Sequence, residues 1–329
     1  MRFIIYGAGG IGGVLGARLF QAGFDVVLIA RGAHYEALRD KGLRLQTPDE
    51  DVLLPIPVID HPAKLHFRPT DLVFLTMKSQ HTATVMEPLR AAAGCDIPVI
   101  CCQNGVANER LALRFFSRVY AMVVIMPANH LEPGIVQTNA RTTTGILDAG
   151  RYPGGVDGTI TEVCAALERA GFSARPDGGV MAQKYAKLLT NLGNALEVIS
   201  QPDPGWRDLA RQLKKEALQC YAAACLPCAT VDEVRHRRDG VFEMGTIGDQ
   251  ERGRGSSWQS IRRGQGSVEC DYLNGEIVQL GRLHGVPTPA NLVLQEMAAE
   301  VARQGWPAGS VEFARVEKRI RQAAGAGDG

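Results

Sequence analysis

Short apolar runs alternate with amphipathic stretches through the first half of the chain. Stretches such as 11–21, 81–93 and 161–171 have the 3.6-residue spacing of helices that bury one face. The apolar runs between and around them are predicted to be strands, at residues 2–6, 25–30, 72–77, 98–102, 119–125 and 172–175. This alternation is typical of a doubly wound parallel sheet, so we expect an α/β fold for this half.

The pattern changes at about residue 179, where the strand-like runs end. Helical periodicity then covers residues 180–200, 206–225, 267–284, 291–304 and 310–323. We therefore expect two domains, an α/β domain over residues 1–178 and an all-helical domain over residues 179–323. The small, polar residues 324–329 are expected to form a flexible tail.

Charge and hydropathy exclude several classes of function. The chain has 36 Lys and Arg against 35 Asp and Glu, and no basic stripe, so nucleic-acid or membrane-surface binding has no electrostatic support. Its most apolar run, residues 119–128, is about half of the roughly 20 residues that a membrane-spanning helix needs. The sequence starts directly with a strand pattern and shows no secretory signal, so we expect a cytoplasmic protein.

The eight cysteines are expected to be reduced thiols in such a protein. Cys225 and Cys228 form a CxxC, with Cys220 nearby, which is the spacing of a redox pair or of half a zinc site. No second pair follows to complete four zinc ligands, and the motif ends a helical pattern rather than a βαβ unit. We favour ordinary packing for these thiols, with a redox role as the alternative.

A GxGxxG motif lies between the first predicted strand and the first predicted helix. Gly7 would permit a tight turn, Gly9 would let a pyrophosphate approach the backbone, and Gly12 would let the helix pack closely on the strand. The order of strand, motif and helix predicts dinucleotide binding in a Rossmann-type domain. The residues of this predicted cofactor loop are Gly7, Ala8, Gly9, Gly10, Ile11 and Gly12.

The end of the second strand favours NADP(H) over NAD(H). A site that prefers NAD places Asp or Glu there, where the carboxylate accepts a hydrogen bond from the ribose 2′-hydroxyl. This strand ends instead in Ala30 and Arg31. A guanidinium can pair with a 2′-phosphate, although Arg31 could also be a solvated loop residue.

Two more loops follow the carboxyl ends of predicted strands. Lys78 comes after strand 72–77, and Asn104 comes after strand 98–102. Ligands of doubly wound sheets bind at these strand ends. Each residue alone reads as an ordinary loop residue, but together with the glycine loop they would surround one crevice.

Lys187, Asn191 and Asn194 recur at i, i+4 and i+7 within the predicted helix 180–200. This spacing predicts that all three lie on one helix face, with leucines between them. Such a polar stripe is either a solvated face or the wall of a polar cleft, and periodicity alone favours the solvated face.

Ordered landmarks along residues 1–305 make the chain resemble the ketopantoate reductase (2-dehydropantoate 2-reductase) family, whose members combine a Rossmann domain with a helical domain and use NADPH. The landmarks are GAGGIG at 7–12, ARG at 30–32, MKSQHT at 77–82, QNG at 103–105, KYAKLLTNLGNAL at 184–196, VECDYLNGEIVQLG at 268–281 and GVPTPAN at 285–291. The resemblance implies reduction of 2-dehydropantoate to pantoate for pantothenate and coenzyme A synthesis. It also allows a homodimer formed through the helical domain.

The resemblance assigns roles residue by residue. Lys187 is the expected general acid, and Glu269 lies near the catalytic lysine and the nicotinamide ribose. A positioned ammonium can polarise the carbonyl and protonate the alkoxide that hydride transfer creates, and no metal is required. Lys78 and Arg31 would bind the cofactor. The substrate and nicotinamide pocket would be lined by Asn104, Asn191, Asn194 and Ser257.

Two departures from the family pattern concern the substrate. Ser260 stands where the family usually has Asp, and Trp258 follows the expected substrate serine. An indole there would reshape the pocket, and the lost carboxylate removes an anchor for basic groups. A reductase of another 2-keto acid is therefore the first alternative, and a non-catalytic NADP(H) redox sensor is the second.

Overall fold

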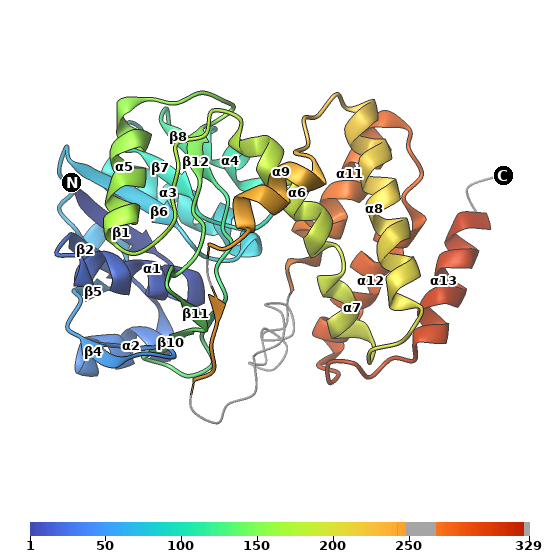
Figure 1. The fold of residues 1–329 in the computed structure, drawn as a ribbon, viewed down its shortest axis with the longest axis horizontal. Coiled ribbons are helices and arrows are strands. Elements are labelled where there is room, and N and C mark those ends of the chain that lie inside the picture. The colour runs from blue at the N-terminus through green and yellow to red at the C-terminus, as the bar shows by residue number, and fades with distance from the viewer. Residues whose placement is uncertain (242, 248–267, 326–329) are drawn as a thin grey trace. The chain divides into compact units, whose positions relative to one another are not determined.

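The computed structural model describes residues 1–241, 243–247 and 268–325. The chain forms two compact units (Figure 1). The sheet unit consists of residues 1–104 and 108–183 together with a return segment that begins at Thr230. The helical unit consists of residues 105–107 and 184–229 and the described residues from Val268 onward. Within the described residues, no helix combines the length and the apolar character needed to cross a membrane.

The main sheet has seven strands in the order β12-β8-β7-β6-β1-β2-β5. Neighbouring strands are parallel, except that β12 runs antiparallel to β8. The α/β fold expected from the sequence is thereby confirmed. Its strands are β1 (Arg2–Tyr6), β2 (Asp25–Ile29), β5 (Val58–Ile59), β6 (Asp71–Leu75), β7 (Val99–Cys101), β8 (Val119–Met122) and β12 (Ala149–Arg151).

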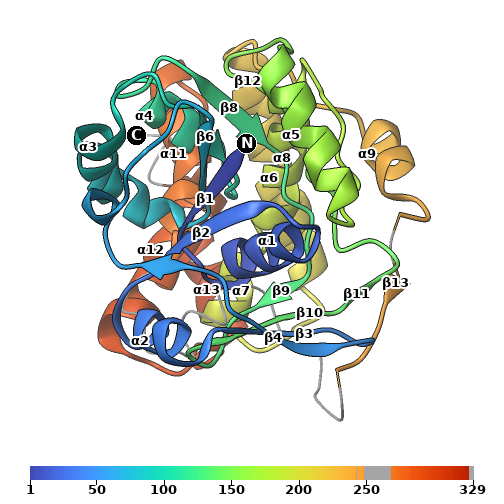
Figure 2. The same cartoon turned by 90° about the vertical axis from the view of Figure 1, so that its left-hand side faces the viewer.

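Helices cover both faces of this sheet (Figure 2). Phe3 and Ile5 of β1 point to the face covered by α1 (Gly10–Gln21) and α5 (Gly158–Arg169). Ile4 and Tyr6 point to the opposite face, with α3 (Thr82–Ala93) and α4 (Asn108–Ala112). Because alternate residues of a strand point to opposite faces, the continuous apolar run of β1 serves two cores at once. The helix α2 (Gly32–Lys41) follows β2.

A second, smaller sheet was not predicted in detail. It contains β4 (Asp51–Leu54), β3 (Leu43–Gln46), β10 (Ile135–Thr138) and β9 (Ala128–Asn129), in that order. The strands β11 (Ala140–Arg141) and β13 (Glu243–Met244) form a further antiparallel pair. The strand predicted at 172–175 is wrong, since Ser173 and Pro176 make only isolated parallel bridges. The ladder is interrupted between these bridges because the backbone N–H of Arg175 donates to the side chain of Asp148, at 3.0 Å, and not to the backbone of the neighbouring strand.

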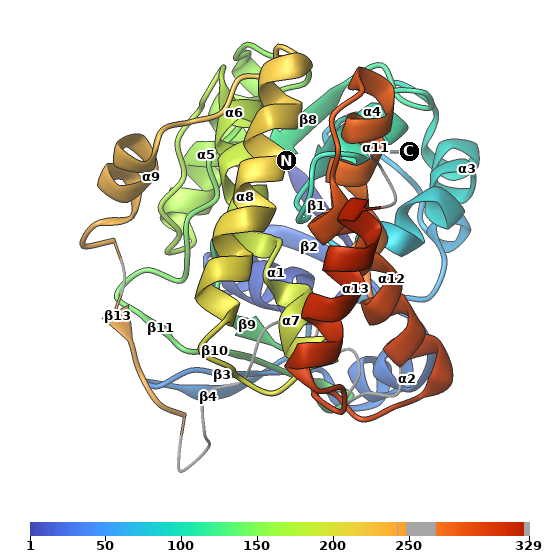
Figure 3. The same cartoon turned by 90° about the vertical axis from the view of Figure 1, so that its right-hand side faces the viewer.

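The helical unit confirms the helix-rich second half of the chain (Figure 3). Its helices are most of α6 (Val180–Asn191), then α7 (Asn194–Ile199), α8 (Trp206–Ala223), η3 (Glu269–Tyr272), α11 (Asn274–His284), α12 (Pro289–Gln304) and α13 (Phe313–Gly325). The helix α12 buries an apolar face at positions 293, 294, 297 and 301 and packs against α7, α8, α11 and α13. It is the central element of this unit.

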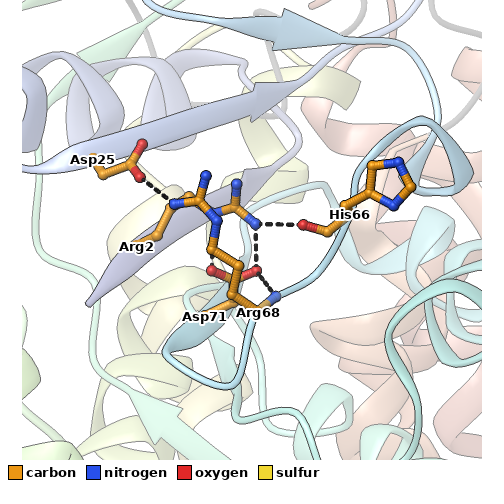
Figure 4. A network of polar contacts seen from close by, with 5 residues as sticks. All are labelled: Arg2, Asp25, His66, Arg68 and Asp71. Carbon is orange, nitrogen blue, oxygen red and sulfur yellow. Dashed lines mark hydrogen bonds and ion pairs between the residues drawn. The ribbon is translucent and has the colours of Figure 1, made fainter.

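An ion pair fixes the amino ends of the main strands (Figure 4). Arg2 donates to both carboxylate oxygens of Asp71, at 2.8 and 2.6 Å, and to the carbonyl oxygen of His66 at 2.8 Å. Both side chains of the pair are buried. The hydrogen bond with Asp71 raises the pKa of Arg2 against the effect of burial. The ion pair therefore lies at the amino ends of β1 and β6. Ligands of doubly wound sheets bind at the opposite edge, where the carboxyl ends of the strands lie.

Candidate active site

The glycine loop connects β1 to α1 with little room around two of its glycines. Gly7 has φ of +109°, and a Cβ there would lie 2.8 Å from the backbone nitrogen of Met77. A Cβ at Gly12 would clash with the carbonyl oxygen of Gly7 and the hydroxyl of Thr76. The Thr76 hydroxyl donates to the carbonyl oxygens of Tyr6 and Gly7. The turn and the close helix packing that the sequence predicted for these glycines are therefore both present.

Gly9 differs from its neighbours because the space beside it is open. The nearest atom to a Cβ at Gly9 would be a ring carbon of His130, at 4.0 Å. Gly9 is the N-cap residue of α1, and no side chain caps the helix there. A helix N-terminus with free space in front of it suits an anion such as a pyrophosphate.

Arg31 lies at the carboxyl end of β2, where it is the N-cap residue of α2 and is exposed. Its backbone is extended, with φ of −136° and ψ of 159°. The strand β2 itself ends at Ile29 with no acidic residue, while Asp60, which follows the neighbouring β5, pairs with Lys64 at 2.7 Å. An exposed guanidinium in this place has the charge that a 2′-phosphate needs.

His34 ties the glycine loop to a distant hairpin, a contact that the sequence did not predict. Its Nε2 donates to the carbonyl oxygen of Ala8 at 2.7 Å, and its Nδ1 accepts from the backbone N–H of Gly134 at 2.9 Å. The ring lies 4.2 Å from that of His130. Burial lowers the pKa of His34 against the effect of the hydrogen bond to Ala8, so the imidazole is neutral. The only signal in the sequence is a polar residue in the first turn after Arg31.

Lys78 and Asn104 follow neighbouring parallel strands. Lys78 is the N-cap residue of η2 (Ser79–His81), two residues after Thr76, whose backbone N–H still donates to Tyr6 of the neighbouring strand β1. Asn104 follows β7, which pairs with β6 in parallel. Since β7, β6, β1 and β2 are adjacent in the sheet, the glycine loop, Arg31, Lys78 and Asn104 all lie along one edge of it. This is the edge where doubly wound sheets bind ligands.

The helix predicted over residues 180–200 is interrupted, which corrects the placement of Asn194. Lys187 and Asn191 share α6, one turn apart, but α6 ends at Asn191 and Asn194 begins α7. Leu192 and Gly193 form a turn between the two helices. The expectation that all three polar residues share one helix face is therefore wrong for Asn194. Glycine is a poor helix former, which accounts for a break that apolar periodicity does not reveal.

Buried side-chain amides of α11 and α12 stabilise this break between α6 and α7. Asn274 at the start of α11 donates to the carbonyl oxygen of Leu192 and to Oδ1 of Asn291, both at 3.1 Å. Asn291 in turn donates to Glu216 at 2.7 Å and to the carbonyl oxygen of Leu213 at 3.2 Å. The turn between α6 and α7 is thereby fixed by side chains more than 80 residues away in sequence. Nothing in the local pattern indicated this network.

Glu269 begins η3 and is buried. It lies in the helical unit, as do Lys187, Asn191 and Asn194. The predicted helix at 267–284 is in fact η3 followed by α11. Ser257, Trp258 and Ser260 lie outside the described residues.

All eight cysteines are free thiols. Cys225 is exposed with φ of +51°, while Cys228 is partly buried. Burial raises the pKa of the Cys228 thiol. A raised thiol pKa lowers the thiolate fraction and is the opposite of what activates redox cysteines.

A glycine loop at the carboxyl edge of a doubly wound sheet, followed by a helical unit with polar side chains on α6 and α7, defines the class of two-domain nicotinamide-dependent oxidoreductases. Family models give the assignment within that class. The model of the ketopantoate reductase PanE/ApbA family matches residues 3–152, and the model of its C-terminal domain matches residues 179–302. The chain belongs to the ketopantoate reductase family.

Individual relatives agree over nearly the full length. A 2-dehydropantoate 2-reductase of Archaeoglobus fulgidus is 29% identical over 310 residues, which cover 91% of this chain and 97% of that protein. The crystal structure of a PanE/ApbA family ketopantoate reductase from Ralstonia eutropha is 27% identical with a TM-score of 0.79, and covers 93% of this chain and 99% of that one. A ternary structure of D-mandelate dehydrogenase with NADH and anilino(oxo)acetate has the same fold, with 22% identity, a TM-score of 0.80 and coverage of 93% and 99%.

Proposed function

We propose that this protein is an NADPH-dependent reductase that converts 2-dehydropantoate to pantoate. The observation that carries the proposal is the pairing of an open Gly9, at the N-terminus of α1, with a helical unit in which Lys187 precedes Asn191 by one turn. The first feature suits a pyrophosphate, and the second supplies a proton donor beside a neutral amide. Membership of the ketopantoate reductase family supports the same reaction.

The residues of the sheet unit fit a phosphorylated dinucleotide. Gly9 leaves space where Gly7 and Gly12 leave none, so the loop could admit the pyrophosphate at one position. We assign the 2′-phosphate to Arg31 because the end of β2 offers a cation and no carboxylate. Lys78, on the same edge, is assigned to the cofactor as a second cation. A 2′-phosphate would be repelled by the acid that NAD sites place at this strand end.

In the reaction, the reduced nicotinamide supplies a hydride to the carbonyl carbon of the 2-keto acid. Lys187 holds a proton on Nζ and donates it to the carbonyl oxygen as negative charge develops there, an effect of roughly 10²- to 10⁴-fold on the rate. Glu269 is assigned to the nicotinamide ribose and to the orientation of Lys187. The side-chain amides of Asn104, Asn191 and Asn194 are assigned as neutral donors to the substrate carboxylate and hydroxyl, with Ser257.

The proposal is tested by measuring the absorbance of NADPH during turnover of 2-dehydropantoate by wild-type protein and two lysine variants. Lys187→Ala should lower kcat by roughly 10²-fold or more, with NADPH affinity, measured by fluorescence, nearly unchanged. Lys214→Ala removes an exposed lysine of α8 in the same unit and should match the wild type. Equal turnover by the Lys187 and Lys214 variants would remove Lys187 from the chemistry.

A second candidate is a reductase of a different 2-keto acid. Trp258 and Ser260 favour it, because both depart from the family pattern beside the expected substrate serine. The structure of D-mandelate dehydrogenase with anilino(oxo)acetate supports including aryl 2-keto acids in the assay. Lysine-dependent oxidation of NADPH with an aryl 2-keto acid, and none with 2-dehydropantoate, would establish this alternative. Running NADH in parallel would decide the cofactor.

A redox sensor is disfavoured. The raised pKa of Cys228 makes a reactive thiolate scarce at neutral pH. NADPH affinity that mild oxidation leaves unchanged, in the wild type and in Cys228→Ser alike, would exclude a sensing role for this thiol.

A further inference from the structure

Four buried polar side chains join the loops that follow β6 and β7. Ser79 and Thr82 come from the chain after β6, whereas Gln103 and Asn108 come from the chain after β7. None of the four exposes more than 5% of its surface. All belong to the sheet unit, and none is among the residues that the proposed reaction uses directly.

Hydrogen bonds connect these four side chains in a series, which we call the relay. Its first half starts at Gln103. Its Nε2 donates one hydrogen to the carbonyl oxygen of Met77 at 2.7 Å and the other to the hydroxyl of Thr82 at 2.8 Å. Because that hydroxyl accepts from Gln103, its own hydrogen is available to Asn108, whose Oδ1 lies 2.9 Å away. Thr82 therefore fixes which end of the Asn108 amide faces it.

The second half follows from that orientation. With Oδ1 turned toward Thr82, Nδ2 of Asn108 donates to the carbonyl oxygen of Asn104 and to the hydroxyl of Ser79, both at 3.1 Å. The Ser79 hydroxyl donates in turn to the same carbonyl of Asn104, at 3.3 Å. Each amide hydrogen of Gln103 and Asn108 thus has one acceptor, and the relay has a single consistent direction.

The relay ends on two backbone carbonyls beside proposed site residues. One is that of Met77, directly before Lys78, and the other is that of Asn104 itself. A different arrangement of either loop would leave buried donors without acceptors, which is costly. The relay therefore favours one arrangement of Lys78 relative to Asn104.

We propose that Thr82 and Asn108 are positioning residues, which lock the loops after β6 and β7 so that Lys78 and Asn104 are presented together. This inference rests on the proposed function for the roles of Lys78 and Asn104. The lock itself is a property of the sheet unit.

A matched set of variants separates the effect of losing the relay's hydrogen bonds from the effect of a general loss of stability. Thr82→Val keeps the shape of the side chain and deletes the hydroxyl, whereas Thr82→Ser keeps the hydroxyl. Val85→Ala removes buried methyl groups from the same helix without touching the relay. Ser79→Ala deletes the 3.3 Å bond to the carbonyl of Asn104 and one acceptor of Asn108 but leaves the Thr82 hydroxyl in place, and serves as a milder version of the test.

Hydrogen exchange of the full-length protein reports the lock without any ligand. Amides of residues 77–82 and 103–108 should exchange roughly tenfold faster in Thr82→Val, a change equivalent to about 1.4 kcal/mol. Ser79→Ala should show a smaller increase in the same two segments. Thr82→Ser and Val85→Ala should match the wild type there. Unchanged exchange in Thr82→Val and Ser79→Ala would overturn the lock.

Steady-state kinetics with NADPH and 2-dehydropantoate report the positioning role. Thr82→Val should raise KM for the 2-keto acid roughly tenfold, a change worth about 1.4 kcal/mol, and Thr82→Ser should restore it. Loss of folded enzyme alone would lower the apparent kcat and leave KM unchanged, as expected for Val85→Ala. Faster exchange with unchanged KM would overturn the positioning role.

The failure of the proposed function would look different. A wild-type protein that neither binds NADPH in a fluorescence titration nor oxidises it with any 2-keto acid would overturn the reductase proposal and with it the positioning role. The exchange experiment would still decide whether the hydrogen bonds of Thr82 and Ser79 lock the two loops.

Discussion

At the scale of single residues, replacing two glycines of the same loop by alanine should have opposite effects on stability and on cofactor binding. A methyl group at Gly9 meets only a ring carbon of His130, at 4.0 Å, whereas one at Gly12 meets the carbonyl oxygen of Gly7, the hydroxyl of Thr76 and, at 2.9 Å, the side chain of Ile5. Gly9→Ala should therefore leave the free energy of unfolding unchanged and weaken NADPH binding more than roughly tenfold. Gly12→Ala should destabilise the fold by about 1–3 kcal/mol or more.

Urea unfolding and NADPH fluorescence titration of both variants check this pair of predictions. The first measures stability and the second measures affinity. If Gly9→Ala bound NADPH as well as the wild type, the pyrophosphate would not approach Gly9, and the cofactor assignment of the loop would be wrong.

Arg31 is predicted to distinguish the two nicotinamide nucleotides. A charge-assisted hydrogen bond is worth about 1.5–3 kcal/mol, so Arg31→Ala should weaken NADPH binding roughly tenfold to a hundredfold. NADH lacks the 2′-phosphate and should be nearly unaffected. Dissociation constants for both nucleotides, measured on both proteins, give the result. An equal loss for NADH would show that Arg31 does not read the phosphate.

The sequence predicted the glycine loop but not the residue that holds it. The pattern GxGxxG is local, and each glycine has a steric reason to be there. His34 contacts Ala8 and Gly134, and the second contact spans 100 residues. A pairing of that length depends on the fold of the whole unit, so no local signal announces it.

At the scale of elements, periodicity predicted most helices and the central strands but not their interruptions. Apolar residues continue at helical spacing through the break at Leu192 and Gly193. Gly193 weakens the helix there, and the buried Asn274 of α11 stabilises the break by donating a hydrogen bond to the carbonyl oxygen of Leu192. Short strands of the second sheet, such as β3 and β9, were missed for a related reason. Both pair with β10, and β3 is far from β10 in the sequence, so the partner of β3 depends on the fold of the whole unit.

Glu216 connects two helices, because this residue of α8 accepts hydrogen bonds from the start of α12. Its carboxylate accepts the backbone N–H groups of Ala290 and Asn291, at 2.9 and 3.0 Å, at the start of α12. Burial raises the pKa of Glu216 above its usual value, and the hydrogen bonds from α12 only partly oppose this. The folded protein therefore keeps a proton over a pH range in which the unfolded chain has released it.

The sign of the pH effect follows from that difference. The contribution of Glu216 to stability is fully present below the ordinary glutamate pKa and is lost as pH rises through the raised pKa. Relative to Glu216→Gln, the wild type should lose free energy of unfolding over the pH range that runs from the ordinary glutamate pKa of about 4.3 up through the raised pKa. Urea unfolding of both proteins across this range measures the difference, in which other carboxylates cancel. A difference that stays constant with pH would contradict the raised pKa.

For the whole molecule, the two halves and their order were predictable, but the path of the chain between them was not. Apolar periodicity changes near residue 179, and a helical unit does follow. The chain nevertheless returns to the sheet unit from Thr230, where α9 (Val231–Arg238) packs and β13 pairs with β11. The sequence of α9 is charged and buries no residue completely, so it gives no sign of a docking face.

Two arginines of α9 differ in the burial of their ion pairs, and the buried pair should hold the return segment on the sheet unit. Arg237 makes a largely buried pair with Asp148, at 2.5 and 2.6 Å, and also donates to the hydroxyl of Ser173 at 2.9 Å. Arg235 pairs with Asp232 of its own helix, and both of those side chains are exposed. Removing one partner of a buried pair leaves an uncompensated charge, whereas an exposed pair contributes little.

Arg237→Ala should therefore destabilise the protein by about 3–5 kcal/mol, and Arg235→Ala by no more than about 1 kcal/mol. Because the buried pair is shielded from ions, the loss in Arg237→Ala should persist in high salt. Hydrogen exchange should show the amides of residues 231–238 released in the Arg237 variant under conditions where β1 and β6 remain protected. If both variants showed the same exchange and the same stability, the return segment would be held by its strand pairing alone, and the Asp148 pair would not be its anchor.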